Sequence, residues 1–169
     1  MDLFAAKASF LSPLGWINVT VEDDAVTEML FSEQPFEQNT LVNDVLIAAI
    51  KQLEEYFNGT RNNFELKLNP RGTDFQVKVW NELLNIPYGK TVSYHEMSSR
   101  LGDEKSIRAA ASANGKNPIA IVIPCHRVIG SDGSLTGYAG GIEKKSWLLN
   151  HEKGVYTPTL FEDKNTLQQ

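Results

Sequence analysis

A break at Asn69-Pro70-Arg71-Gly72 divides this 169-residue chain into two unlike parts and is the feature that most restricts its fold. Proline lacks the backbone N–H that helices and sheets require, so a regular element does not continue across this stretch. Residues 1–70 carry 4 Lys and Arg against 11 Asp and Glu, whereas residues 71–152 carry 10 against 8. We therefore predict two domains, residues 1–70 and residues 71–169. All three histidines and the single cysteine follow the break, so we expect function there.

The part before the break combines strand and helix periodicities. Apolar residues alternate from Leu14 to Thr20 and from Val26 to Phe31 around a polar turn, which predicts an antiparallel hairpin. Residues 41–57 carry an apolar residue every fourth position and predict a helix. Residues 64–68 alternate again and predict one more strand. This part is expected to be a small antiparallel sheet with a helix.

The part after the break is predicted to be mostly helical. Thr73 can cap a docking helix that extends to Ile86. Residues 93–102 and 103–117 predict two short helices joined by a glycine-containing turn, which is a helix-turn-helix. The predicted fold class is α/β, a sheet-plus-helix domain followed by this helical one.

The second of the two short helices has an unusual surface. From Arg108 to Gly115 it presents almost nothing larger than a methyl group beyond its arginine. Such a surface can approach a nucleic-acid backbone or groove closely. Small residues also permit tight packing between helices, and the sequence leaves both interpretations open.

A reactive thiol is predicted at Cys125. Residues 119–123 form an apolar run typical of a buried strand, and Pro124 ends it. His126 and Arg127 follow Cys125 directly, an electropositive setting of the kind that lowers a cysteine pKa and favours the nucleophilic thiolate. The alternative is a buried cysteine that serves as a small hydrophobic residue.

A base and an orienting group complete this hypothesis. His126 can assist Cys125 only if Pro124 turns the chain or a water relays the proton. Glu152, at the end of a helix predicted over residues 142–152, is the candidate for orienting the imidazole, and His151 competes with it. The glycine-rich loop over residues 136–141 contains Tyr138, a candidate pocket wall.

Composition excludes several classes of protein. No apolar run is long enough for a membrane span and the first residues lack a basic signal-peptide start, so we expect a cytoplasmic protein with no membrane partner. A net charge of −5 argues against a protein that coats DNA electrostatically. One cysteine forms no internal disulfide and makes a thiolate zinc site unfavourable, so we expect no metal and no other cofactor.

These residues together resemble the O6-alkylguanine-DNA alkyltransferases, also called methylated-DNA–protein-cysteine methyltransferases. The resemblance covers about residues 73–152 and is most specific at the Pro-Cys-His-Arg-Val run. It is carried by Ile123-Pro124-Cys125-His126-Arg127-Val128, Ser93-Tyr94, Arg108, Asn117-Pro118, Tyr138 with Gly140-Gly141, and Trp147-Leu148-Leu149 before His151-Glu152.

The resemblance implies a stoichiometric reaction. Cys125 would take the alkyl group from O6-alkylguanine, and less efficiently from O4-alkylthymine, in one irreversible turnover. His126 would act as base through a water, Glu152 would hold His126, and Asn117 would brace the segment. Tyr94 would donate to guanine N3 and help the base to leave.

It also implies how DNA is bound. The second helix would enter the minor groove of double-stranded DNA without sequence preference, and Arg108 would fill the space left by the flipped nucleotide. Tyr138 with nearby backbone amides would hold O6, and the Val128 carbonyl would accept from the guanine amino group. We expect a monomer whose DNA- and base-binding residues are Ser93, Tyr94, Arg108, Ala109, Ala113, Asn114, Val128, Tyr138, Ala139 and Lys145.

Three other functions compete with this one. A non-transferring alkyltransferase-like protein would bind the lesion but lack the cysteine, which Cys125 argues against. A cysteine hydrolase would turn over esters or peptides. A helix-turn-helix regulator would bind a specific DNA sequence independently of alkylation.

Overall fold

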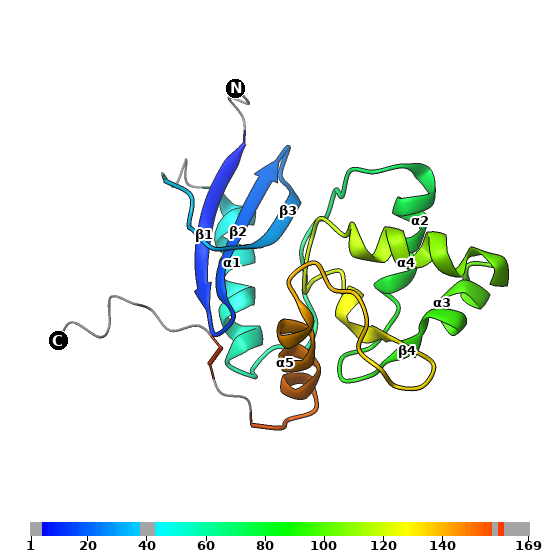
Figure 1. The fold of residues 1–169 in the computed structure, drawn as a ribbon. Coiled ribbons are helices and arrows are strands. Elements are labelled where there is room, and N and C mark those ends of the chain that lie inside the picture. The colour runs from blue at the N-terminus through cyan, green and yellow to red at the C-terminus, as the bar shows by residue number, and fades with distance from the viewer. Residues whose placement is uncertain (1–4, 38–42, 157–158, 161–169) are drawn as a thin grey trace.

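The computed structural model describes residues 5–37, 43–156 and 159–160. A three-stranded antiparallel sheet of order β1-β2-β3 comes first in the chain, and helix α1 packs against it (Figure 1). Its elements are β1 (Ala6–Ser12), β2 (Gly15–Glu22), β3 (Ala25–Ser32) and α1 (Asp44–Phe57).

Most of the remaining elements are helices, grouped beside the sheet in Figure 1. They are α2 (Asp74–Leu83), β4 (Val92–Ser93), α3 (Tyr94–Arg100), the 3₁₀ turn η1 (Glu104–Ser106), α4 (Ile107–Gly115), the 3₁₀ turn η2 (Cys125–Arg127), β5 (Val128–Ile129) and α5 (Ile142–Glu152). The mixed α/β class, with a sheet first and helices after it, confirms the predicted fold class. No helix in the described ranges is long and apolar enough to cross a membrane.

The hairpin β2–β3 forms where the alternation predicts it. Ile17 and Val19 are completely buried on one face of the sheet, as the two-residue period of a strand requires. Helix α1 buries Leu46, Ala49 and Leu53, and Asn43 caps it by accepting from the Leu46 amide at 3.0 Å. The predicted start of this helix at Leu41 lies outside the described residues.

Two details of the first part differ from the prediction. Strand β1, which pairs with β2 from Ala6 to Ser12, was not predicted. Its two alanines are only weakly apolar, so the alternation of a strand is weak here. The strand predicted over residues 64–68 is wrong, because only Leu68 forms an isolated bridge, with Val26 of β3. Residues 64–66 alternate in polarity without forming a strand.

The strand predicted over residues 119–123 is also wrong. Ile119 alone bridges β3, at Met29. Ile121 then has a φ of +72°, and the Val122 amide donates to the Ala120 carbonyl at 2.8 Å, so the chain reverses here. An unbroken apolar run indicates burial but does not distinguish a strand from a buried turn.

The helix-turn-helix is supported by helix α2. Thr73 begins α2 with a capping box. Trp80 is buried, and its indole Nε1 donates to the Ala113 carbonyl of α4 at 2.9 Å. Together α2 and α3 hold α4 on the side opposite its exposed face.

Replacing Trp80 by Phe tests this support. The substitution removes the indole donor from the Ala113 carbonyl, which keeps the Lys116 amide, and it removes packed volume, so the free energy of unfolding is expected to fall by about 1–3 kcal/mol. Urea denaturation measures the change, and Trp16→Phe is the matched control because Trp16 is only half-buried. Equal stability losses in the two variants would contradict the proposed support.

Candidate active site around Cys125

Cys125 lies on the short 3₁₀ turn η2, directly after the reversal at Ile121. Residue Cys125 is 5% exposed, and its Sγ accepts from the Asn117 side-chain amide at 3.2 Å. The same amide donates to the Ile123 carbonyl at 2.7 Å, and Asn117 Oδ1 accepts from the Ile119 amide at 2.9 Å. Asn117 therefore holds both ends of the chain reversal at residues 119–123 and also contacts the thiol that follows it.

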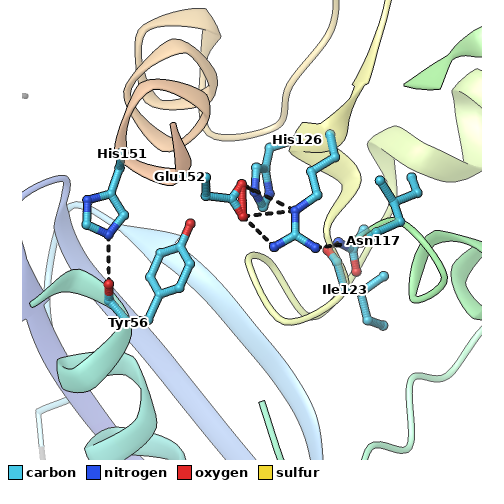
Figure 2. A network of polar contacts seen from close by, with 8 residues as sticks. Tyr56, Asn117, Ile123, His126, His151 and Glu152 are labelled. Carbon is cyan, nitrogen blue, oxygen red and sulfur yellow. Dashed lines mark hydrogen bonds and ion pairs between the residues drawn. The ribbon is translucent and has the colours of Figure 1, made fainter. Parts of the chain in front are cut away.

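The next residue, His126, is paired with Glu152 at the end of α5. His126 Nε2 lies 2.9 Å from Glu152 Oε2, and both side chains are buried. Figure 2 shows Glu152 directed toward His126, with His151 on the opposite side of α5. His151 instead contacts the Tyr56 carbonyl at 2.7 Å and stacks on Trp147. The structure thus pairs Glu152, not its competitor His151, with the imidazole.

Arg127 is the third member of this buried network. Its Nε donates to Glu152 Oε1 at 2.9 Å, its Nη2 pairs with the same carboxylate, and its Nη1 donates to the Ile86 carbonyl at 2.7 Å. The guanidinium also lies 5.8 Å from the centre of the Tyr88 ring. Arg127 therefore ties η2 to α5 and to the segment after α2, a role that sequence reasoning missed.

This geometry corrects the predicted effect on the thiol. Arg127 is directed at Glu152, and burial raises the pKa of Cys125, opposed by the Asn117 hydrogen bond and the charge of Lys145. The thiol is consequently protonated at neutral pH, and a base must remove its proton.

His126 has the protonation state of a base. Burial lowers its pKa, opposed by the hydrogen bond and the charge of Glu152. Burial acts to raise the pKa of Glu152, but hydrogen bonds and charges from His126 and Arg127 hold it below its ordinary value. The pair is therefore a neutral imidazole beside a carboxylate. His126 Nδ1 is buried without a hydrogen-bond partner among the described residues.

Tyr94 and Lys145 meet at one backbone carbonyl. The Tyr94 hydroxyl and the Lys145 ammonium each donate to the Thr136 carbonyl at 3.1 Å. Lys145 Nζ also lies 5.7 Å from the centre of the Tyr94 ring, and the lysine is completely buried. The parallel pairing of β4 with β5 places Tyr94 near η2, because β4 leads into Tyr94 and β5 follows Arg127.

A cavity of about 170 Å³ opens at Cys125. Asn117, Tyr138 and Ala139 line it with the thiol, and so do Leu30 and Phe31 of β3. The Tyr138 hydroxyl has no hydrogen-bond partner in the described structure, and burial raises its pKa well above the ordinary value. Sequence reasoning missed Leu30 and Phe31, because no local pattern indicates a contact so distant along the chain.

The remaining predicted DNA contacts separate into exposed and buried residues. Arg108 and Ala109 are exposed on α4, and Ala139 is exposed on its loop. Ala113 and Asn114 are buried on the opposite side of α4, where Asn114 donates to the Cys125 carbonyl at 3.3 Å. The structure therefore does not bring these two to the exposed face.

Two further candidates have local structural partners. Ser93 caps α3 by accepting from the Glu96 amide at 3.0 Å. Val128 is completely buried and begins β5. Among the residues with described positions, no three His, Cys, Asp or Glu side chains gather as a metal site would require.

Comparisons with known proteins show the family of this chain. Residues 6–70 match the family model of the ribonuclease-like domain of 6-O-methylguanine DNA methyltransferase, and residues 74–154 match that of its DNA-binding domain.

Two curated relatives and one solved structure cover most of the chain. The methylated-DNA–protein-cysteine methyltransferase of Mycobacterium tuberculosis is 44% identical over 84% of this chain and 88% of its own. The constitutive enzyme of Bacillus subtilis is 42% identical over 86% and 93%. The crystal structure of M. tuberculosis OGT in complex with DNA superimposes with a TM-score of 0.77 at 42% identity, over 86% of this chain and 91% of that one. The chain therefore belongs to the O6-methylguanine DNA methyltransferase family, enzymes of DNA repair that act on methylated DNA and a protein cysteine.

Proposed function

We propose that this protein removes the alkyl group from O6-alkylguanine in double-stranded DNA and keeps it on Cys125. The observation that carries the proposal is the placement of a buried thiol in a cavity, beside a histidine that a buried carboxylate orients. O4-alkylthymine would be a less efficient substrate, since it also offers an alkyl group on an exocyclic oxygen.

The transfer is a nucleophilic substitution at the alkyl carbon. His126 takes the thiol proton through a water, and the resulting thiolate attacks the carbon bonded to O6. The S–C bond forms as the C–O6 bond breaks, and the bonding electron pair stays with the guanine. Overall, the thiol and O6-alkylguanine give a thioether and guanine. The proton that leaves the thiol ends on the guanine. The thioether has no facile route back, so each molecule acts once and irreversibly.

Several groups are proposed to help guanine leave. Tyr94 donates to N3, which lets the base depart uncharged, and Tyr138 with the Ala139 amide holds O6. The Val128 carbonyl accepts from the exocyclic amino group. The contact of Lys145 with the Thr136 carbonyl supports this arrangement, because it fixes the loop that carries Tyr138. The Tyr94 hydroxyl, which donates to the same carbonyl in the free protein, would exchange it for N3 when the base enters.

Helix α4 is proposed to enter the minor groove. Its exposed face bears Arg108 and the small side chains of Ala109 and Ser112, which suit a groove roughly 6 Å wide. Reaching O6 requires extruding the nucleotide at a cost of about a few kcal/mol, and Arg108 would fill the space it leaves. Minor-groove readout is degenerate, so the protein acts without sequence preference. We propose that it acts as a monomer.

We further propose that residues 71–169 form the DNA-binding and alkyl-acceptor domain. The net negative charge of residues 1–70 supports a position for that part away from the DNA phosphates.

The substitution Cys125→Ala tests the reaction. It removes the nucleophile from a buried site with little change of volume, so alkyl transfer should disappear while binding to an O6-methylguanine duplex remains. Quantification of O6-methylguanine left in the DNA and a gel-shift titration measure the two. Residual repair by the variant would exclude Cys125 as the acceptor.

The substitution Glu152→Gln tests the base. Without the carboxylate the influences that raise the His126 pKa are lost, so the imidazole becomes less basic and the transfer rate should fall by about 10²-fold. Single-turnover rates are measured at several pH values, with thermal melting to establish folding. Glu143→Gln, exposed on the same helix, is the control and should react normally. A folded Glu152 variant with an unchanged rate would contradict the role given to His126.

The substitution Arg108→Ala tests nucleotide flipping. Transfer from duplex DNA should slow by about tenfold or more, while transfer from the free base O6-methylguanine should change little. Arg100→Ala removes an exposed arginine of α3 and provides the control. Equal losses on duplex and free base would remove Arg108 from the flipping role.

A further inference from the structure

The cavity in front of Cys125 has a wall that comes from the amino-terminal sheet. Leu30 and Phe31, near the end of β3, line it together with Cys125 and Tyr138. Figure 1 shows β3 as the strand of the sheet nearest to the helical part of the molecule. The site that receives the alkyl group is therefore not formed by the second part of the chain alone.

Backbone hydrogen bonds fix this wall to the loop that leads to the thiol. The Met29 amide donates to the Pro118 carbonyl at 2.9 Å, and the Ala120 amide donates to the Met29 carbonyl at 2.8 Å. Met29 directly precedes Leu30, and Ala120 itself lines the cavity. The position of the wall relative to Cys125 is thus set by main-chain geometry.

The Phe31 ring is held in place by close contacts. It meets the Tyr138 ring edge-on, with centroids 6.3 Å apart, and the Lys144 ammonium lies 5.8 Å from its centre. A Cβ at Gly140 would come within 3.0 Å of both Phe31 Cδ2 and Tyr138 Cε1. Glycine at this position lets the loop approach the ring, so Phe31 presents a fixed apolar surface.

The size and lining of the cavity indicate what can occupy it. Its volume is about 170 Å³, and Leu30, Phe31 and Ala120 make part of its wall apolar. An apolar cavity of roughly 150 Å³ accommodates benzene, whereas a water-sized group takes up only about 30 Å³. The guanine held by Tyr138 and Ala139 would itself enter this space, so a methyl group on O6 would add little contact with the apolar wall, whereas an aromatic substituent would reach it.

We propose that Phe31, assisted by Leu30, determines which alkyl groups the protein accepts, by contacting large apolar substituents such as benzyl. This inference rests on the proposed transfer to Cys125 and adds a specificity determinant from the amino-terminal sheet. The bond changes are those of the methyl reaction, with the benzylic carbon as the atom attacked. The selectivity lies in contacts beyond that carbon, which a methyl group does not make.

The test compares two lesions in the same duplex sequence. Single-turnover rates are measured with O6-benzylguanine and O6-methylguanine for the unmodified protein and for Phe31→Ala. The ratio of benzyl to methyl rates should fall roughly tenfold in the variant, since the aromatic and apolar contacts with the benzyl ring are lost. The ratio does not depend on how much of the protein is active, so a loss of stability does not mimic the effect.

Two more variants sharpen the comparison. Phe10→Ala removes an aromatic ring from the same sheet, where Phe10 stacks on Phe57 at 6.0 Å outside the cavity lining. Its rate ratio should equal that of the unmodified protein. Phe31→Leu keeps an apolar side chain and should give an intermediate ratio, and it serves in place of Phe31→Ala if the smaller residue prevents folding.

Each outcome separates the inference from the function on which it rests. An unmodified protein that transfers neither group would overturn both. Transfer of both groups with an unchanged ratio in the Phe31 variants would overturn the inference and leave the function standing. A ratio that rises in Phe31→Ala would also overturn it, because the ring would then exclude large groups instead of contacting them.

Discussion

The buried carboxylate of Glu152 is the interaction on which the arrangement of the site depends. This carboxylate, at the end of α5, pairs with the side chains of His126 and Arg127 from η2. Arg127 also donates to the Ile86 carbonyl, which extends the network to the segment after α2. A carboxylate in this position would be strongly unfavourable without its partners, and the loss of one partner leaves a buried charge uncompensated. The network thus fixes the end of α5 and orients the imidazole, while burial lowers the pKa of His126 and keeps the ring neutral. The network also directs Arg127 to Glu152, and burial raises the pKa of the neighbouring Cys125 thiol.

The second constraint on the structure is the pairing of the outer edge of β3, the edge that does not face β2. Near one end it pairs with the segment around Leu68, where the Val26 amide donates to the Lys67 carbonyl at 2.8 Å. At Met29 it pairs with Ile119, in the turn that carries the active-site loop. An exposed strand edge is a liability in a small sheet, and here both partners come from the chain itself. The same pairing places Leu30 and Phe31 at the cavity, so the fold of the first part and the shape of the reactive site have a common cause.

The elements that could be predicted from sequence are those with local signals. The capping residue Thr73 and the apolar residues of the helices predicted α2 and α5. The adjacent residues Cys125 and His126 indicated where the reactive group lies. The turn at Ile121 could not be predicted, because an apolar run has the same pattern in a buried strand. The direction of Arg127 was missed because its partner Glu152 is distant in sequence. The predicted lowering of the thiol pKa failed because the fold buries the thiol, which the charged residues next to Cys125 do not indicate. The burial of Ala113 and Asn114 could not be predicted, because residue size does not indicate which face of a helix is buried, and Asn114 lies at the Cys125 cavity instead of on the exposed face.

Cys125 Sγ is proposed to be the final acceptor of the alkyl group. Peptide mass spectrometry after mixing the intact protein with an O6-methylguanine duplex tests it most directly. We expect one methyl group per protein molecule, located on the peptide that contains Cys125, with guanine restored in the DNA in equal amount. A methyl group on another residue, or repaired DNA with unmodified protein, would contradict it.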